Sequence, residues 1–192
     1  LPAGQVYAEA QFALSQPAGR VVSSDKRCGK VGLQKGAAEF RLSCGEVEIR
    51  IDRGTGLLSS IEYESEKMLL NPLAPNFWRA PTDNDFGNYM PDWAAAWKEA
   101  VDHRQLDSLR LVTEEKSLVQ IQAEYRFSDA AGQPVAAWSA LFSFDTAGEL
   151  HVLNYFRKPE GQPIVPRIGM NVELRPDLDQ VSWFGRGPFE NY

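Results

Sequence analysis

The sequence predicts an all-β protein whose antiparallel sheets stack as a sandwich, with one short helix between the strands. Apolar and polar residues alternate over most of residues 38–63 and 119–174, with the two-residue period of half-buried strands. Turn sequences such as Arg-Gly-Thr-Gly at 53–56 and Asp-Ala-Ala-Gly at 129–132 separate these runs. Consecutive strands joined by tight turns form antiparallel sheets, which bury their apolar faces by stacking.

Regular patterning begins only after an irregular N-terminal region. Residues 5–15 alternate in part and predict one strand, which has no partner nearby. Residues 16–36 are rich in glycine and serine and show little periodicity, which indicates a linker. We therefore expect a domain boundary here.

From residue 38 the strands follow in order. Phe40 and Leu42 precede a turn at Cys44-Gly45, after which apolar residues alternate with charged ones up to residue 52, as in a hairpin with one wet face. The glycines of 53–56 suit a turn because glycine adopts positive φ at little cost, and no helix follows them as a phosphate-binding loop would require. Further strands are expected at 57–63, 119–127, 135–144, 150–156 and 167–174.

A single helix is predicted at residues 91–101. Pro91 and Asp92 suit its first turn, and Trp93, Trp97 and Ala100 fall on one side. The tryptophans of this sequence are expected mainly in the core, since large rings in a sandwich are more often core than sugar platform.

Composition excludes several functional classes. Hydrophobic residues at 43% and a length of 192 residues indicate a folded globular chain. The net charge of −6 comes without a basic stripe, so nucleic acid is not an expected partner. Apolar stretches fall short of the roughly 18–20 residues of a membrane span, and no signal peptide is recognisable, so no membrane partner is expected.

Cys28 and Cys44 lack the spacing of a zinc site and the density of a disulfide scaffold, and are expected to be free thiols. His103 and His151 are isolated in the sequence, so the usual nitrogen and sulfur ligands of a structural metal are missing. We predict that this chain holds no metal.

Residues 71–90 interrupt the regular pattern. Prolines at 72, 75 and 81 argue against a central strand, and the segment carries several charged residues. Long loops of this kind are often functional. A purely structural interpretation is also open, in which Phe77 and Trp78 anchor the loop in the core while Asp83 and Asp85 cap backbone N–H groups or pair with Arg79.

Three functional interpretations of this loop compete with the structural one. Calcium binding by Asp83 and Asp85 is disfavoured, because Gly87 follows Asp83 by four positions and the EF-hand order is not met. A glycosidase acid/base pair is disfavoured because its two groups lie about 5–10 Å apart across a sugar, and these residues are two positions apart with no second cluster. We favour a loop that projects over a sugar site built by another domain.

Residues 76–87, with the sequence NFWRAPTDNDFG, are the most distinctive part of the chain. Together with Trp93, Trp97-Lys98, the sequence RIGM at 167–170 and WFGRGPFENY at 183–192, they resemble the C-terminal small-chain domain of family 2 β-galactosidases in order and spacing. The resemblance covers residues 38–192. Residues 1–20 are similar to the last strand of the immunoglobulin-like domain that precedes it, and residues 21–37 form the linker.

The resemblance implies a supersandwich related to galactose mutarotase, truncated here to about half its strands. Members of the family hydrolyse terminal β-galactosides with retention, using two glutamates of an upstream TIM barrel. Nothing in this chain corresponds to that barrel, so we expect no catalytic residue here and no activity from the chain alone. The magnesium and sodium ions that the family commonly uses bind in other domains, so no cofactor is expected in this chain.

The resemblance also implies that this domain borders the sugar site, and that a β-galactoside substrate is bound there through the barrel. It further implies a mobile loop that pivots at Gly87. We expect the border to consist of Arg79, Asp83, Asn84, Asp85, Gly87 and Asn88.

Two other functions stay open: an independent carbohydrate-binding module, and a mutarotase-like epimerase with a histidine acid and a carboxylate base. Neither histidine has motif context for the epimerase. A truncated sandwich leaves unpaired strand edges, so we expect self-association into a homo-oligomer. The compartment stays open between bacterial cytoplasm and periplasm.

Overall fold

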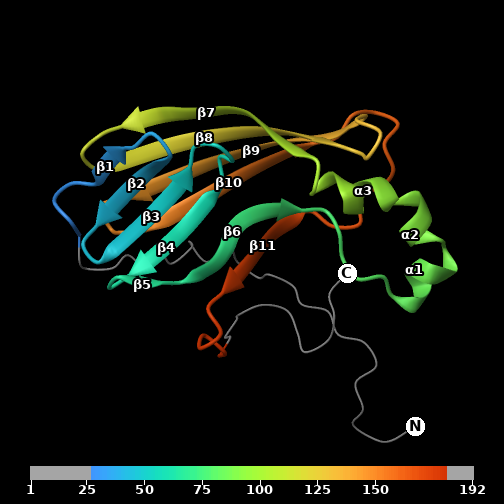
Figure 1. Cartoon of the computed structure of the whole chain (residues 1–192), viewed down its shortest axis with the longest axis horizontal. Helices are drawn as coiled ribbons and strands as arrows, with labels where there is room; N and C mark the ends of the chain where they lie inside the picture. Colours follow the sequence, from blue (N-terminus) through green and yellow to red (C-terminus); the bar gives the residue numbers. More distant parts are fainter. Residues whose placement is uncertain (1–26, 181–192) are drawn as a thin grey trace, which may run out of the picture.

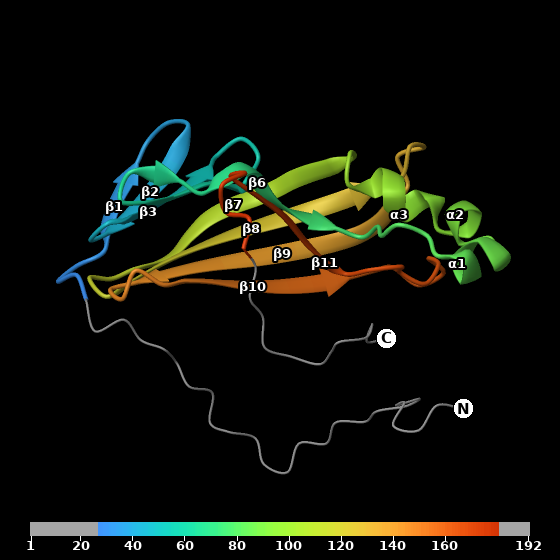
Figure 2. The same ribbon diagram turned by 90° about the horizontal axis from the view of Figure 1, so that it is seen from below.

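The computed structural model describes residues 27–180 of the chain, and these form two antiparallel sheets that face each other across one core (Figures 1 and 2). The seven-stranded sheet has the order β1-β2-β3-β4-β6-β11, with β5 paired to β4, and the four-stranded sheet has the order β10-β9-β8-β7. Three short helices lie together at one end of the sandwich (Figure 1). The all-β sandwich expected from the alternation is confirmed.

The strands of the first sheet are β1 (Gly32–Lys35), β2 (Glu39–Cys44), β3 (Val47–Asp52), β4 (Leu58–Tyr63), β5 (Glu66–Lys67), β6 (Leu69–Asn76) and β11 (Gly169–Leu174). Those of the second are β7 (Arg104–Glu114), β8 (Leu118–Ser128), β9 (Pro134–Asp145) and β10 (Leu150–Arg157). The helices are α1 (Asp83–Gly87), α2 (Met90–Trp93) and α3 (Ala95–Ala100). No helix in the described part of the chain is long and apolar enough to cross a membrane.

The β2–β3 hairpin forms as its alternation predicts. Leu42 lies opposite Ile49 and Phe40 opposite Ile51, and all four side chains are buried. The other face carries charged residues, where the Arg50 guanidinium lies 2.8 Å from Glu48 and 3.0 Å from Glu62. Alternation therefore separates a core face from a wet face.

The prediction of free thiols is wrong, because Cys28 and Cys44 form a disulfide. Strand β1 pairs with β2 so that Gly32 lies opposite Ser43, and this register brings the segment before β1 beside the end of β2. The Cα atoms of the two cysteines are 5.5 Å apart, within the range of a disulfide. Strand β1 lies inside residues 21–37, for which a linker was predicted; residues 1–20 lie outside the described part.

The prediction that residues 71–90 contain no central strand is also wrong. Strand β6 lies between β4 and β11 although it contains Pro72 and Pro75. Its registered pairing with β4 is one residue pair, Leu58 with Leu73, and its pairing with β11 shifts register beside Pro72. Pro72 is tolerated because the ladder with β11 is already broken beside it, so the hydrogen bond that it cannot donate is not required there. Pro75 lies opposite Met170 of β11 in regular register, and no registered β4 residue lies on its other side.

One helix was predicted, and the structure has three short ones. The predicted residues 91–101 divide into α2 and α3 at Ala94, and α1 forms within the expected loop. Trp97 and Ala100 are buried as expected, whereas Trp93 is 39% exposed. The Trp93 indole N–H donates to the Asn88 carbonyl at 3.1 Å, so this ring lies against the loop rather than in the core.

Rings from both layers meet in the core at the helical end of the sandwich. Phe77 is fully buried and contacts four other rings, with ring centroids 4.9 to 5.8 Å away. The four rings belong to Trp97, Phe127, Trp138 and Phe156. This cluster anchors the segment between β6 and α1 to the four-stranded sheet, as the structural interpretation of Phe77 proposed.

Candidate functional site

The segment between β6 and α1 is closed by an ion pair. The Arg79 guanidinium donates two hydrogen bonds to the Asp85 carboxylate, one from Nη1 to Oδ2 and one from Nη2 to Oδ1 at 2.8 Å. This two-point geometry fixes both groups in one orientation. The Asp85 side chain is largely buried, whereas that of Arg79 is one-third exposed. Two predicted site residues therefore bind each other.

Asp85 also holds the start of α1. Its Oδ2 accepts hydrogen bonds from the Thr82 backbone N–H at 2.8 Å and from the Thr82 hydroxyl at 3.0 Å. The first of these is the return bond of a capping box, in which the third helical residue binds the residue before the helix. The hydrogen bonds from Arg79 and from Thr82 hold the pKa of Asp85 well below its usual range. The carboxylate is therefore ionised and engaged at neutral pH.

The remaining predicted site residues lie on the outer side of this closed loop. Asp83, Asn84, Gly87 and Asn88 are all exposed. Gly87 is the last residue of α1 and does not have a positive φ. The residue with a positive φ in this loop is Tyr89, at 60°. Asn84 accepts the Asn88 backbone N–H through its own carbonyl, at 3.1 Å, so the two amide side chains lie one helical turn apart.

Three aromatic rings beside these polar groups are also exposed, and sequence reasoning did not assign them to the site. Phe86 is 60% exposed, Tyr89 is 71% exposed and Trp93 is 39% exposed. Phe86 belongs to α1 and Trp93 to α2, and Tyr89 lies between the two helices with a positive φ, so no single helical period in the sequence could have identified the three rings as a group. The loop thus presents amides, a carboxylate and rings together, which are the groups that suit a hydroxyl-rich ligand.

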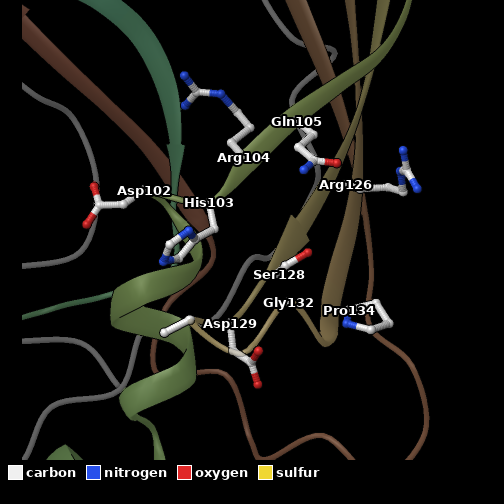
Figure 3. A pocket seen from close by; sticks show the side chains of 10 residues that line it. Asp102, His103, Arg104, Gln105, Arg126, Ser128, Asp129, Gly132 and Pro134 are labelled. Atoms are coloured by element: carbon white, nitrogen blue, oxygen red, sulfur yellow. The ribbon is translucent and has the colours of Figure 1, made fainter.

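A second candidate is an open hollow of about 530 Å³ where the chain leaves α3 (Figure 3). Arg126 in it is held by Asp107 at 2.6 Å, and the Asp129 carboxylate accepts the Gln133 backbone N–H at 2.8 Å. Figure 3 shows His103 on the segment after α3 and Asp129 on a neighbouring segment at the end of β8. The lining of the hollow is mostly polar and contains no phenylalanine, tyrosine or tryptophan; it consists of Asp102, His103, Arg104, Gln105, Arg126, Ser128, Asp129, Ala130, Gly132 and Pro134.

One group of side chains in the described residues offers metal-ligand atoms close together. Those of Asp145, Glu149 and His151 lie within 4.8 Å of one another. Asp145 Oδ1 already accepts the backbone N–H groups of Ala147 and Glu149, and the His151 imidazole lies 3.4 Å from Glu149. These contacts account for the arrangement as a turn cap with a histidine–carboxylate contact beside it, so we assign no ion to it. That the chain holds no metal stays a prediction.

Comparison with known proteins identifies the family. The family model described as "Beta galactosidase small chain" matches residues 43–192, more than half of the chain. This chain belongs to the β-galactosidase small-chain family. The family interpretation of the sequence NFWRAPTDNDFG is thereby confirmed.

Curated relatives of this small-chain sequence are much longer proteins. The chain is 31% identical to a β-galactosidase of Aeromonas hydrophila over 80% of its own length and 16% of the relative's. It is 30% identical to a β-galactosidase of Priestia megaterium over 73% of its length and 13% of the relative's, and 28% identical to that of Oenococcus oeni over all of its length and 19% of the relative's. The small-chain sequence thus spans less than a fifth of these relatives.

Proposed function

We propose that this chain is a non-catalytic part of a larger, retaining β-galactosidase and that it borders the sugar site of a barrel encoded elsewhere in that enzyme. Three β-galactosidases named above, of which it matches less than a fifth, support this proposal. So does the arrangement of carboxylates in the loop. Asp85 is engaged by Arg79 and Thr82, so Asp83 and Asp85 cannot act as the two free carboxylates of a glycosidase.

The observation that carries the proposal is the contrast between the two sides of the loop. Phe77 and the Arg79–Asp85 pair fix the inner side, while Asn84 and Asn88 face outward beside the exposed rings. A site border needs this combination, because polar groups contribute to sugar binding only where the backbone that carries them is already ordered.

The test is steady-state kinetics of the full-length enzyme that contains this chain. Asn84→Ala and Asn88→Ala should each raise KM for a β-galactoside several-fold and leave the melting temperature unchanged. Gln34→Ala provides the control, since Gln34 is exposed on β1, at the opposite end of the sandwich (Figure 1). Unchanged kinetics in both asparagine variants would remove the loop from the site border.

An independent carbohydrate-binding module is the second candidate, and the polar hollow beside α3 is the observation that favours it. Isothermal titration of the isolated chain with galactose and lactose separates the two functions. If the chain only borders a site that a barrel completes, the titration should give no measurable heat. If the chain is a binding module, the heat should saturate with added sugar, and Arg104→Ala should weaken the binding. Hydrolysis of a chromogenic β-galactoside by the isolated chain should be absent under either function.

The hollow also brings His103 together with Asp102 and Asp129, the residue types that a mutarotase-like epimerase would use. Polarimetry of freshly dissolved galactose tests this third function. A rate of mutarotation that the chain accelerates and that His103→Ala abolishes would favour it over both others.

A further inference from the structure

The disulfide between Cys28 and Cys44 joins two backbone segments that other contacts also hold in place. Cys28 donates its backbone N–H to the Thr146 carbonyl at 2.8 Å, and Val31 donates its own to the Lys116 carbonyl at 2.9 Å. Both carbonyls belong to turns of the four-stranded sheet, between β9 and β10 and between β7 and β8. The segment before β1 is therefore fixed against the opposite sheet.

Cys44 is fixed by its own strand. It is the last residue of β2, it pairs with Val47 of β3, and it is 6% exposed. Figure 1 shows β1 and β2 at the end of the sandwich away from the helices. Since the Cα atoms of Cys28 and Cys44 are 5.5 Å apart, the two positions suit a disulfide without any movement of the backbone. The bond is thus part of the packed fold.

Other roles of a close cysteine pair do not fit these surroundings. A zinc site needs further ligands, and the group of metal-ligand side chains found among residues 27–180 contains neither cysteine. A redox-active pair needs an exposed thiol in electropositive surroundings. Cys44 instead belongs to the apolar core, and the charged residues that line the open hollow beside the pair are Arg27 and Glu46, which have opposite signs. The pair is therefore a structural disulfide.

We propose that the complete protein containing this chain folds and acts outside the cytoplasmic membrane, in an oxidising compartment. Both cysteines of the 192-residue chain are used in this one bond. Structural disulfides persist in such compartments, whereas glutathione and thioredoxin keep cytoplasmic thiols reduced. Of the two compartments that the sequence leaves open, the disulfide favours the periplasm. This location does not rest on the proposed function, because neither the loop nor a sugar enters it.

Formation of the bond needs an oxidant, and the class that supplies it is a thiol oxidase with a reactive disulfide of its own. The thiolate of one cysteine attacks a sulfur atom of the oxidase and forms a mixed disulfide, and the thiolate of the other cysteine then displaces the oxidase. Cys28 and Cys44 together lose two electrons and two protons, and the oxidase gains both as a dithiol. An oxidising compartment holds such an acceptor in its oxidised form.

Peptide mass spectrometry of the complete protein, from the cells that make it, tests the location. The cells are separated into a cytoplasmic fraction and a fraction outside the cytoplasmic membrane, with free thiols alkylated throughout. Trypsin releases residues 28–30 and 42–50 as two peptides, each with one cysteine, so the bond leaves them as one linked peptide. This linked peptide should account for nearly all of Cys44, should disappear on reduction, and should come from the outer fraction.

The same protein produced in a reducing bacterial cytoplasm is the control, and both of its peptides should be alkylated. The Cys28→Ser, Cys44→Ser double variant confirms the assignment of the linked peptide, which it cannot form. The proposal is overturned if both peptides are alkylated in the source cells, because the thiols are then free. It is equally overturned if the linked peptide comes from the cytoplasmic fraction, or if the cytoplasmic control contains it.

Discussion

Asp85 is the residue on which the candidate loop depends most. It receives hydrogen bonds from Arg79 and from the Thr82 backbone and hydroxyl, so one carboxylate joins the segment after β6 to the start of α1. Because these donors favour the charged form, the pKa of Asp85 is lowered. The stability that it contributes is present above the unfolded-state pKa of about 3.9 and is lost as the pH falls through the lower pKa of the folded state.

Replacing Asp85 by asparagine should therefore lower the melting temperature at neutral pH, and the difference from wild type should shrink in strongly acidic solution. Thermal melts at a series of pH values from about 7 to about 2 measure this. Asp83→Asn is the control, since Asp83 is an exposed carboxylate two positions away. A constant difference at every pH would contradict the assignment of the effect to the Asp85 charge.

The disulfide is a second single-residue feature with a measurable contribution. Cys28 and Cys44 are 16 positions apart, and closing a loop of that length restricts the unfolded chain by about 3 kcal/mol. The Cys28→Ser, Cys44→Ser double variant should lose about 2–4 kcal/mol of unfolding free energy in urea titrations. Reduction by dithiothreitol should destabilise the wild type by a similar amount and leave the double variant unaffected. If dithiothreitol changes the stability of both proteins equally, the disulfide does not form in solution.

The sequence predicted some of these residue contacts and missed others for identifiable reasons. Pairing of Arg79 with Asp85 could be proposed because the partners are six positions apart within one loop. The cysteine pair could not, because it depends on the register of β1 against β2, which no local pattern specifies. Trp93 was expected in the core, and its exposure follows from the division of one predicted helix into α2 and α3.

At the scale of elements, the turn between β3 and β4 contacts the opposite sheet. Gly56 has a φ of 71°, and its carbonyl accepts the buried Tyr125 hydroxyl at 2.6 Å. A Cβ at Gly56 would lie 2.5 Å from Leu106 Cδ1 and 2.9 Å from the Tyr125 hydroxyl. Glycine is therefore required here both for backbone conformation and for the close approach of the sheets. Burial also raises the pKa of Tyr125, which stays neutral and able to donate.

Gly56→Ala should consequently destabilise the protein more than Gly132→Ala. Gly132 has a similar φ of 78°, but nothing lies within 4 Å of a Cβ placed there, so its substitution reports the backbone cost alone. The steric clash at Gly56 should add about 1–3 kcal/mol to the loss of unfolding free energy. Chemical denaturation of the two variants measures the difference, and equal losses would show that the turn does not contact the second sheet as described.

Elements were predictable where one face is buried and the ladder is regular. Strands β2, β3, β8 and β9 follow their alternation because each has a core face and a wet face. Strand β7 was not predicted, since its two register shifts break the two-residue period. Strand β6 was excluded on its prolines, although its register with β11 shifts beside Pro72 and its registered pairing with β4 is a single residue pair, Leu58 with Leu73.

At the scale of the whole molecule, the candidate loop and the sandwich share one core. Phe77 lies between the sheets and contacts Trp97 of α3 as well as rings on three strands of the four-stranded sheet. The loop is therefore coupled to the packing of both layers rather than attached to the surface. A protein built in this way should unfold as one cooperative unit.

Phe77→Ala tests this coupling, because it removes a fully buried ring from the centre of the cluster. The expected loss of unfolding free energy is about 3–5 kcal/mol, since the surrounding rings can collapse only in part. Phe86→Ala is the matched control from the same loop: Phe86 is 60% exposed, and its loss should change stability by less than about 0.5 kcal/mol. Urea transitions followed by far-ultraviolet circular dichroism, which reports the sheets, and by tryptophan fluorescence, to which Trp97 and Trp138 of the cluster contribute, should coincide in all three proteins. A fluorescence transition that precedes the loss of strand signal in the wild type would show that the loop and helices unfold separately, and Phe77 would then stabilise that end of the molecule alone.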